Sequence, residues 1–211
     1  IVHVVLAIAV LAVVARLVLL GDRVAHWDEG RVAYWIDYYA ASGSFAYRRI
    51  IHGPFIQHVN RWLFTFAETS DFLMRVPVAI IGGLFPLSAL LFRRHLRGHE
   101  KVALALFLGA NAVLLYYSRF MRSDMLVAVF MFVGLGLLVR FYDTRRFRYL
   151  YGLGVFVALG FASKENAVVY LLTWFGGAAL LADQALYRPR NADSGYAVLK
   201  RSWLGRQGAR L

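Results

Sequence analysis

Apolar residues dominate the chain in six long stretches, which cover residues 1–20, 71–92, 102–117, 125–139, 149–162 and 167–182. A helix needs roughly 20 mostly apolar residues to cross the hydrocarbon core of a bilayer. The first two stretches have that length, and flanking residues extend the shorter ones. The pattern predicts an all-α fold, which is a polytopic transmembrane bundle of about six helices.

One long polar segment, residues 21–70, separates the first two stretches. Its part EGRVAYWIDYYAAS (29–42) places apolar and aromatic residues at helical spacing, and Trp and Tyr are common at membrane interfaces. The sequence SGS at 42–44 ends this helix, and Pro54 is a favoured first residue for a second one. We therefore predict an extramembrane loop with two helices, of which the first is interfacial and the second is interfacial or re-entrant.

Composition supports a membrane protein, because 60% of the residues are hydrophobic, whereas an ordinary soluble domain has about one half. The chain has no cysteine, which excludes disulfides and thiolate metal sites. It begins at Ile1 and ends on a basic run, so we interpret it as an N-terminal fragment. We expect one transmembrane module over 1–182, followed by a truncated basic segment over 183–211.

Basic residues follow the alternation of the predicted spans. Segments 93–101 and 140–148 have four each, and the tail from 183 has six. Because cytoplasmic segments are enriched in Lys and Arg, we predict a multi-pass cell-membrane protein with both ends in the cytoplasm and loop 21–70 outside. The net charge of +12 is then a topology signal, and no nucleic-acid partner is predicted.

Several ionisable residues lie on the predicted outer side, at the ends of different spans. Such groups are costly at membrane depth and are usually functional. Packing of the spans would bring these ends together, so we predict an outward-facing polar cavity. Its candidate residues are Asp28, Glu29, Arg31, Arg119, Arg122, Asp124, Lys164 and Glu165.

The pair Asp28–Glu29 has two interpretations. Asp28 can be the N-cap of the interfacial helix, with Glu29 near its positive end. Alternatively, Asp28 is a general base that accepts a proton from a sugar hydroxyl. Arg31 lies three residues after Asp28, on the same helix face, where it can hold a phosphate.

The turn YYSRFMRSDM (116–125) contains Arg119 and Arg122. They can be arginines that extend to the interface, with Ser123 or Asp124 capping the next span. Two guanidinium groups also suit a phosphate or pyrophosphate.

The turn ASKEN (162–166) has the same two interpretations. Ser163 can be an N-cap with Glu165 in the first turn of the next helix. Alternatively, Lys164 contacts a lipid phosphate and Glu165 faces the cavity.

The histidines of the outer loop are His26, His52 and His58. Together with Asp28 they can approach a divalent metal, but none of them forms a ligand pair at i and i+4. We therefore predict no metal ligands, although a divalent metal stays possible.

Five segments in order resemble a known superfamily. They are DEGR (28–31), HGPF (52–55), FLMRVPVAIIGGL (72–84), YSRFMRSDM (117–125) and SKENA (163–167). Over residues 1–182 the chain resembles the GT-C glycosyltransferases of the protein mannosyltransferase and aminoarabinose transferase type. Among these it resembles an archaeal branch that is associated with flippase activity in protein N-glycosylation.

The resemblance implies a polyprenyl-phosphate-linked sugar as donor, and a glycan, protein or lipid acceptor on the extracytoplasmic face. It implies Asp28 as base, and Glu29 as the residue that positions the acceptor or a metal. Arg31, Arg119 and Arg122 would bind the lipid phosphate, and His52 stands where some relatives have a phosphate-contacting lysine. Two alternatives stay open, a flippase or transporter of lipid-linked sugars and a non-catalytic accessory subunit.

Overall fold

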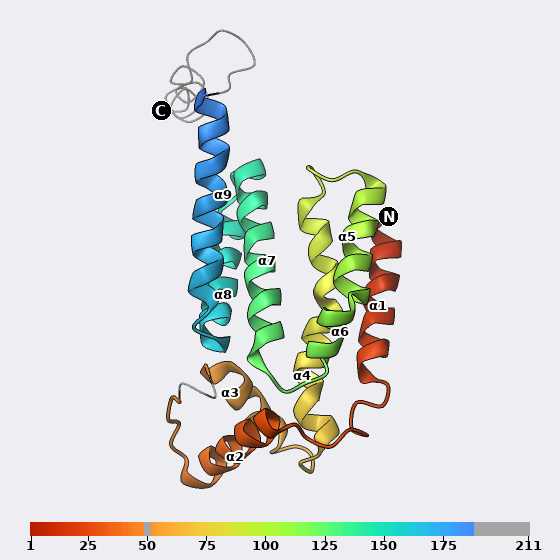
Figure 1. The fold of residues 1–211 in the computed structure, drawn as a ribbon, viewed down its shortest axis with the longest axis vertical. Helices are drawn as coiled ribbons and strands as arrows, with labels where there is room; N and C mark the ends of the chain where they lie inside the picture. Colours follow the sequence, from red (N-terminus) through yellow and green to blue (C-terminus); the bar gives the residue numbers. More distant parts are fainter. Residues whose placement is uncertain (49–51, 188–211) are drawn as a thin grey trace. The chain divides into compact units, whose positions relative to one another are not determined.

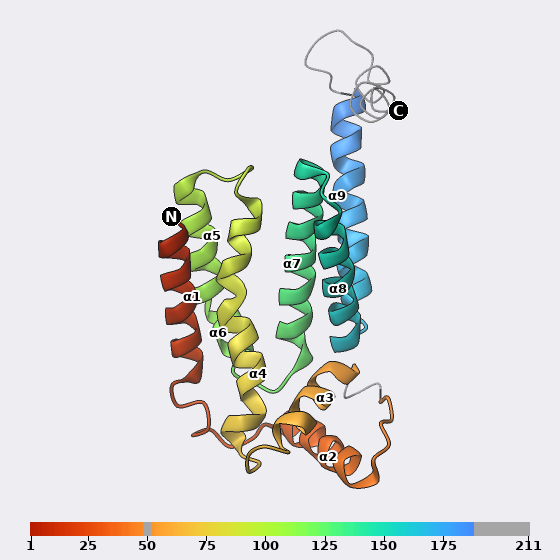
Figure 2. The same cartoon turned by 180° about the vertical axis from the view of Figure 1, so that it is seen from behind.

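The computed structural model describes residues 1–48 and 52–187, and within them it is helical without a β-strand (Figures 1 and 2). The predicted all-α fold is thereby confirmed for this part of the chain. Most of the predicted basic segment 183–211 lies outside the described residues. The helices are α1 (Val2–Leu17), α2 (Trp27–Ser42), α3 (Pro54–Leu63), α4 (Asp71–Leu84), the 3₁₀ helix η1 (Phe85–Phe92), α5 (Gly98–Ala110), α6 (Ala112–Tyr117), α7 (Ser123–Thr144), α8 (Phe147–Ser163) and α9 (Ala167–Tyr187).

Among the described residues, two helical segments are long and apolar enough to cross a membrane. They are Asp71–Phe92, made of α4 and η1, and Ser123–Thr144, which is α7. Their mean hydropathies are 1.8 and 2.2. Val2–Leu17, Phe147–Ser163 and Ala167–Leu181 are shorter apolar helices, and the count of six spans stays a prediction.

The predicted span 102–117 is divided into α5 and α6 at Asn111. The Asn111 side-chain oxygen accepts hydrogen bonds from the backbone N–H groups of Val113 (3.0 Å) and Leu114 (3.2 Å). It therefore caps the start of α6, because the first N–H groups of a helix have no partner within the helix.

Residues 1–167 form one compact unit and residues 168–211 a second, whose described part is α9. In the first unit, α2 and α3 lie at one end of α1, α4, α7 and α8 (Figures 1 and 2). A buried cluster joins Ile36 of α2 and Ile56 of α3 to Val78 of α4 and Leu126 of α7. This core packs the two helices of the predicted loop, α2 and α3, against α4 and α7.

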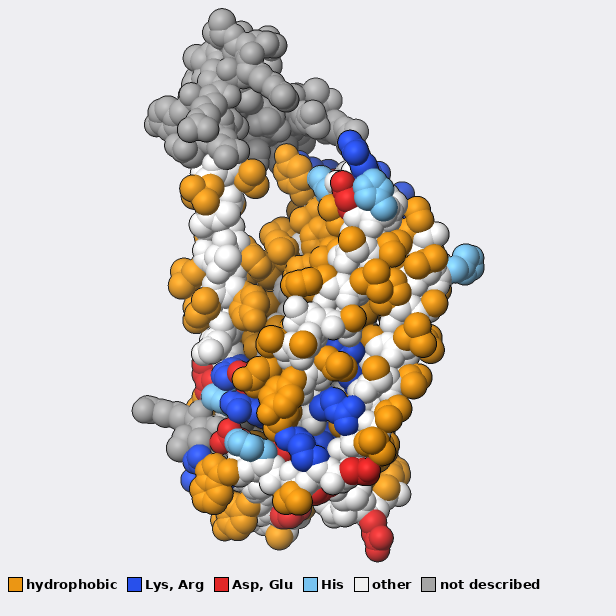
Figure 3. Space-filling model, turned by 45° about the vertical axis from the view of Figure 1, so that its right-hand side comes forward, with side chains coloured by type: hydrophobic (Ala, Val, Ile, Leu, Met, Phe, Trp, Pro, Cys, Tyr) orange, Lys and Arg blue, Asp and Glu red, His pale blue; other side chains and the backbone are white. Residues whose placement is uncertain are grey.

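The middle of the first unit has an apolar exterior. Figure 3 shows a band of hydrophobic side chains between charged groups at the two ends of the helices. In α1, Val10 and Leu11 are 62% and 68% exposed. A long apolar surface of this kind is typical of contact with lipid or with further transmembrane helices.

Candidate functional site

The site begins at the first turn of α2. The helix starts at Trp27, and its N-cap is His26, whose Nδ1 accepts a hydrogen bond from the backbone N–H of Asp28 (3.2 Å). Glu29 completes a capping box, because its Oε2 accepts the backbone N–H of His26 at 2.9 Å. The interpretation of Asp28 as the N-cap was therefore wrong, and its carboxylate is left for other contacts. The predicted end at 42–44 is confirmed by Gly43, which has φ +70°.

Glu29 is fully buried and joins four parts of the first unit. Arg75 of α4 donates to both of its carboxylate oxygens, at 2.8 Å and 3.1 Å. The backbone N–H of Met121 donates at 2.9 Å, and Arg23 donates at 3.1 Å. With His26, this carboxylate receives five hydrogen bonds. It connects α2 to α4 and to the turn before α7.

The surroundings of Glu29 stabilise its charged form. Burial by itself raises the pKa of the carboxyl group. The hydrogen bonds from Arg75, His26 and Met121 together lower the pKa by more than burial raises it, so the net pKa lies below the ordinary value. Its oxygens are occupied by protein donors. Glu29 therefore positions its neighbours, whereas the predicted contact with an acceptor or metal would require these bonds to break.

Asp28 belongs to a different arrangement, a chain of alternating charges. Nη1 of Arg122 lies 3.0 Å from Oδ2 of Asp28, and Nε of the same arginine donates to Oδ2 of Asp124 at 3.1 Å. Lys164 Nζ lies 2.5 Å from Oδ1 of Asp124. We call Asp28, Arg122, Asp124 and Lys164 the charged chain. It joins α2, the start of α7 and the turn after α8.

The two carboxylates of the predicted pair thus differ in what they can do. Oδ1 of Asp28 makes no hydrogen bond with another residue of the described ranges, and the side chain is 36% exposed. Glu29 has neither exposure nor a free oxygen. Of these two carboxylates, Asp28 is the one that can accept a proton from a bound group without a rearrangement of the protein.

His52 and Glu165 lie beside the charged chain. Nδ1 of His52 is 3.1 Å from Oε2 of Glu165. The backbone N–H of Gly53 donates to the carbonyl of Ser163 at 3.2 Å. A Cβ on Gly53 would stand 2.1 Å from the carbonyl oxygen of Ala162, so only glycine allows the loop to approach α8 this closely.

The environment of His52 favours its neutral form. Burial and the charges of Lys164 and Arg122 lower the pKa of the imidazole, Asp124 and Asp28 raise it, and the net pKa lies below its ordinary value. The residue also has φ +65°, a left-handed conformation that is uncommon for a residue with a side chain. A neutral imidazole at this position, fixed by its contact with Glu165, can donate or accept a hydrogen bond.

The turn before α7 does not bring its two arginines together. Arg119 donates to the carbonyl oxygens of Ala15 and Leu19, both at 3.0 Å. The guanidinium of Arg119 therefore binds backbone carbonyl groups in the last turn of α1 and just after it, whereas Arg122 belongs to the charged chain. The geometry does not support the expectation that Arg119 and Arg122 bind one anion as a pair.

Neither of the other predicted caps is present. Ser163 is the last residue of α8, and its hydroxyl donates to the carbonyl of Leu159 at 2.8 Å. In α7 the N-cap is Arg122, so Ser123 and Asp124 lie inside the first turn. The carboxylate of Asp124 therefore does not cap α7, and its Oδ1 accepts a hydrogen bond from Nζ of Lys164.

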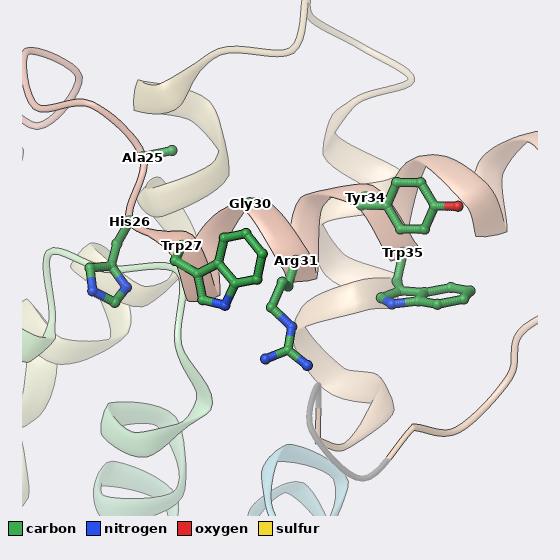
Figure 4. Close-up of a pocket in the computed structure, with 7 residues that line it drawn as sticks. All are labelled: Ala25, His26, Trp27, Gly30, Arg31, Tyr34 and Trp35. Carbon is green, nitrogen blue, oxygen red and sulfur yellow. The ribbon is translucent and has the colours of Figure 1, made fainter.

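Arg31 lines a separate groove on α2, of about 390 Å³. Figure 4 shows its guanidinium group beside the ring of Trp27, on the same side of the helix as Trp35. The guanidinium carbon is 5.9 Å from the centre of the Trp27 ring. Ala25, His26, Gly30 and Tyr34 complete the lining. Arg31 and Asp28 are neighbours on α2, but Arg122 is the arginine that pairs with Asp28.

Among the side chains that the structure describes, in residues 1–48 and 52–181, no group of three or more His, Asp or Glu residues is placed to hold a metal ion. Of the three histidines considered for a metal, His58 has its Nδ1 3.1 Å from the hydroxyl of Tyr39. His26 caps α2 and His52 contacts Glu165. The three imidazoles thus have different partners.

The sequence interpretation missed Arg75, Arg23 and Gly53. Arg75 had a detectable signal, because it is a charged residue inside the apolar stretch 71–92, where such residues are rare. Arg23 and Gly53 carried no such signal. Their roles depend on a contact with Glu29 and on a close approach to α8, which only the folded chain defines.

Two apolar helices of membrane length, with a cluster of charged residues at one end, are features of a membrane protein whose polar site lies at the ends of its helices. The family model of dolichyl-phosphate-mannose-protein mannosyltransferase matches residues 51–198. The chain belongs to this family of membrane glycosyltransferases, so the predicted class is confirmed at this level. Searches of curated proteins and of solved structures gave no match.

Proposed function

We propose that the protein transfers a sugar from a polyprenyl-phosphate donor to an acceptor, and that this sugar is mannose. The transfer takes place at the end of the molecule formed by α2 and α3. The observation that carries the proposal is the ion pair between Asp28 and Arg122. It places a carboxylate with a free oxygen against a cation that suits a phosphate. In a transfer from a lipid phosphate, the carboxylate can take the acceptor proton and the cation can stabilise the leaving phosphate.

Arg122 and Lys164 are the proposed ligands of the donor phosphate. Asp124 contacts both of them, one with each oxygen, and so keeps two positive groups adjacent. Nη2 of Arg122 has no hydrogen-bond partner among the described residues and can donate to a phosphate oxygen. Cations stabilise the negative charge that develops on the phosphate as the bond to the sugar breaks.

Asp28 is the proposed general base. The acceptor hydroxyl attacks the anomeric carbon of the sugar, and its proton passes to Oδ1 of Asp28. A new carbon–oxygen bond forms at the anomeric carbon, and the bond to the phosphate oxygen breaks. The products are the glycosylated acceptor and free polyprenyl phosphate.

The other predicted residues take supporting roles in the proposal. Glu29 and Arg75 position Asp28 and Arg122, because Glu29 adjoins Asp28 and binds the N–H of Met121, the neighbour of Arg122. His52 and Glu165 flank Lys164 at the edge of the charged chain. Arg31 contacts the donor from the groove. Arg119 is left outside the phosphate site.

The membrane arrangement is also part of the proposal. It consists of six spans within 1–182, the charged chain on the extracytoplasmic face and the ends in the cytoplasm, together with the archaeal glycosylation branch. The alternation of basic segments supports this orientation. In the structure, Arg94, which follows η1, donates to the carbonyl of Asp143 near the end of α7 at 2.7 Å, and His95 lies 2.9 Å from the carboxylate of Asp143. The helices α2 and α3 lie at the other end of α7 (Figure 1).

The test uses the full-length protein in lipid nanodiscs, with polyprenyl-phosphate-mannose as donor and a panel of peptide, glycan and lipid acceptors. We expect free polyprenyl phosphate to appear together with a mannosylated acceptor. Saturable donor binding without phosphate release would contradict a transferase and favour a transporter. Movement of the donor across vesicles, without release, would identify that transporter.

A further inference from the structure

The groove on α2 is not explained by the charged chain. It is lined by aromatic side chains and a single cation, Arg31. Trp27 is 74% exposed and Tyr34 is 61% exposed, although both belong to a helix whose other face is buried. Within the described ranges, the Arg31 side chain has neither an ion pair nor a hydrogen bond to another residue. Its five N–H donors are available to a ligand.

The groove adjoins the proposed base. Trp27 directly precedes Asp28. Arg31 follows Asp28 by three residues on α2, and residues three apart on a helix are neighbours on its surface. Arg122 meets Asp28 from the side of the bundle. A substrate whose phosphate lies at Arg122 and whose reacting carbon lies at Asp28 therefore continues over Trp27 and Arg31. The part of the donor that follows the reacting carbon is the sugar ring.

The lining suits a sugar ring chemically. The face of an indole is the negative side of its quadrupole, and it attracts the weakly positive C–H groups of a pyranose. The guanidinium of Arg31, which Figure 4 shows beside that indole, can donate hydrogen bonds to ring hydroxyl groups. Aromatic walls with a few polar groups are the usual lining of small-molecule sites. The volume of about 390 Å³ is sufficient for one hexose.

We infer that this groove is the sugar subsite of the donor, with Trp27 as the stacking platform and Arg31 as the hydroxyl ligand. The inference rests on the proposed function, since it assumes that the donor phosphate lies at Arg122. The groove then gives the protein its affinity for the sugar. The charged chain, in contrast, recognises the phosphate of any polyprenyl phosphate.

The test measures dissociation constants of the full-length protein in nanodiscs for two probes, polyprenyl-phosphate-mannose and polyprenyl phosphate. The ratio of the two constants reports only the contribution of the sugar. We expect wild type to bind the mannose-bearing lipid more tightly, and Trp27→Ala to lose this advantage by about fivefold to tenfold. Trp27→Phe keeps an aromatic face and should retain most of it. Trp62→Ala is the matched control, because Trp62 is 62% exposed and lies outside the groove on α3.

Three results would overturn the inference. The first is equal binding of both probes by wild type, and the second is an unchanged ratio in Trp27→Ala. The third is equal weakening of both probes by Trp27→Ala and Trp62→Ala, which would show that exposed tryptophans only anchor the protein at the interface. The ratio does not depend on turnover, so a missing phosphate release would reject the transferase proposal without touching the subsite.

Discussion

Nη1 of Arg122 lies 3.0 Å from Oδ2 of Asp28, across the junction between α2 and the start of α7. The same arginine binds Asp124, which in turn binds Lys164. The proposed base and the proposed phosphate ligands therefore form one connected structure. Such a site is preorganised, so little rearrangement is needed when charge develops on the leaving phosphate.

The first prediction separates the two arginines of the turn before α7. Arg122→Gln removes a charged ligand of the phosphate, and we expect the dissociation constant of polyprenyl phosphate to rise about tenfold to a hundredfold. Arg119→Gln should leave this constant within about threefold, because Arg119 binds the carbonyls of Ala15 and Leu19. Titration of nanodiscs with the lipid measures both. An equal loss of affinity in the two variants would support the expectation from the sequence that Arg119 and Arg122 bind the phosphate together.

The second prediction concerns the buried pair of Glu29 and Arg75, both of which have side chains with 0% exposure. Glu29→Gln leaves the guanidinium of Arg75 without its carboxylate, which should lower the free energy of unfolding by on the order of 3 kcal/mol. The double variant Glu29→Gln with Arg75→Met should recover part of this loss, since no unpaired charge remains. Chemical unfolding in detergent measures these free energies. A loss in the double variant larger than the sum of the losses in the two single variants would contradict the pairing.

The third prediction is the pH dependence of that stability. The pKa of Glu29 lies below 4.5 in the folded protein, so the unfolded chain binds more protons in the window below that value. Its contribution is complete above about pH 4.5 and is lost as the pH falls through the folded pKa. We expect the slope of stability against pH in this window to be smaller in Glu29→Gln than in wild type. Identical slopes would show that the Glu29 carboxyl is not stabilised in its charged form.

The spans were the most predictable part of the fold. The apolar stretch 71–92 coincides with the helical segment Asp71–Phe92, and 125–139 lies within Ser123–Thr144. Hydrophobic runs predict such segments directly, because most of their residues face either lipid or another apolar surface. The break at Asn111 was not predicted, because a single amide side chain within an apolar run is a weak signal until its capping bonds are seen.

The candidate site was predictable in its members and not in their roles. Charged residues at the ends of several spans indicated Asp28, Arg122, Asp124 and Lys164, and the structure brings these four together. Local spacing could not distinguish Asp28 from Glu29, because adjacent residues on a helix point in directions about 100° apart and the partners come from α4 and the turn before α7. The division between a base and a positioning residue is therefore a property of the packing.

The fourth prediction tests the loop that carries His52. Gly53→Ala places a Cβ 2.1 Å from the carbonyl oxygen of Ala162, so the loop must move away from α8. We expect a loss of about 1–3 kcal/mol in the free energy of unfolding and weaker donor binding, because His52 leaves Glu165 and Lys164. Gly154→Ala on α8 is the control, since an added Cβ there meets no atom within 4 Å. Equal stability of the two variants would contradict the close approach.

The central claim is that Asp28 is the base of a glycosyl transfer, and one measurement tests it most directly. It compares wild type and Asp28→Asn in nanodiscs, at saturating polyprenyl-phosphate-mannose and acceptor, by the initial rate at which free polyprenyl phosphate is released. We predict a rate lowered by about 10²–10⁴ in a folded variant that still binds the donor within about threefold. A folded Asp28→Asn that releases polyprenyl phosphate at the wild-type rate would contradict the account.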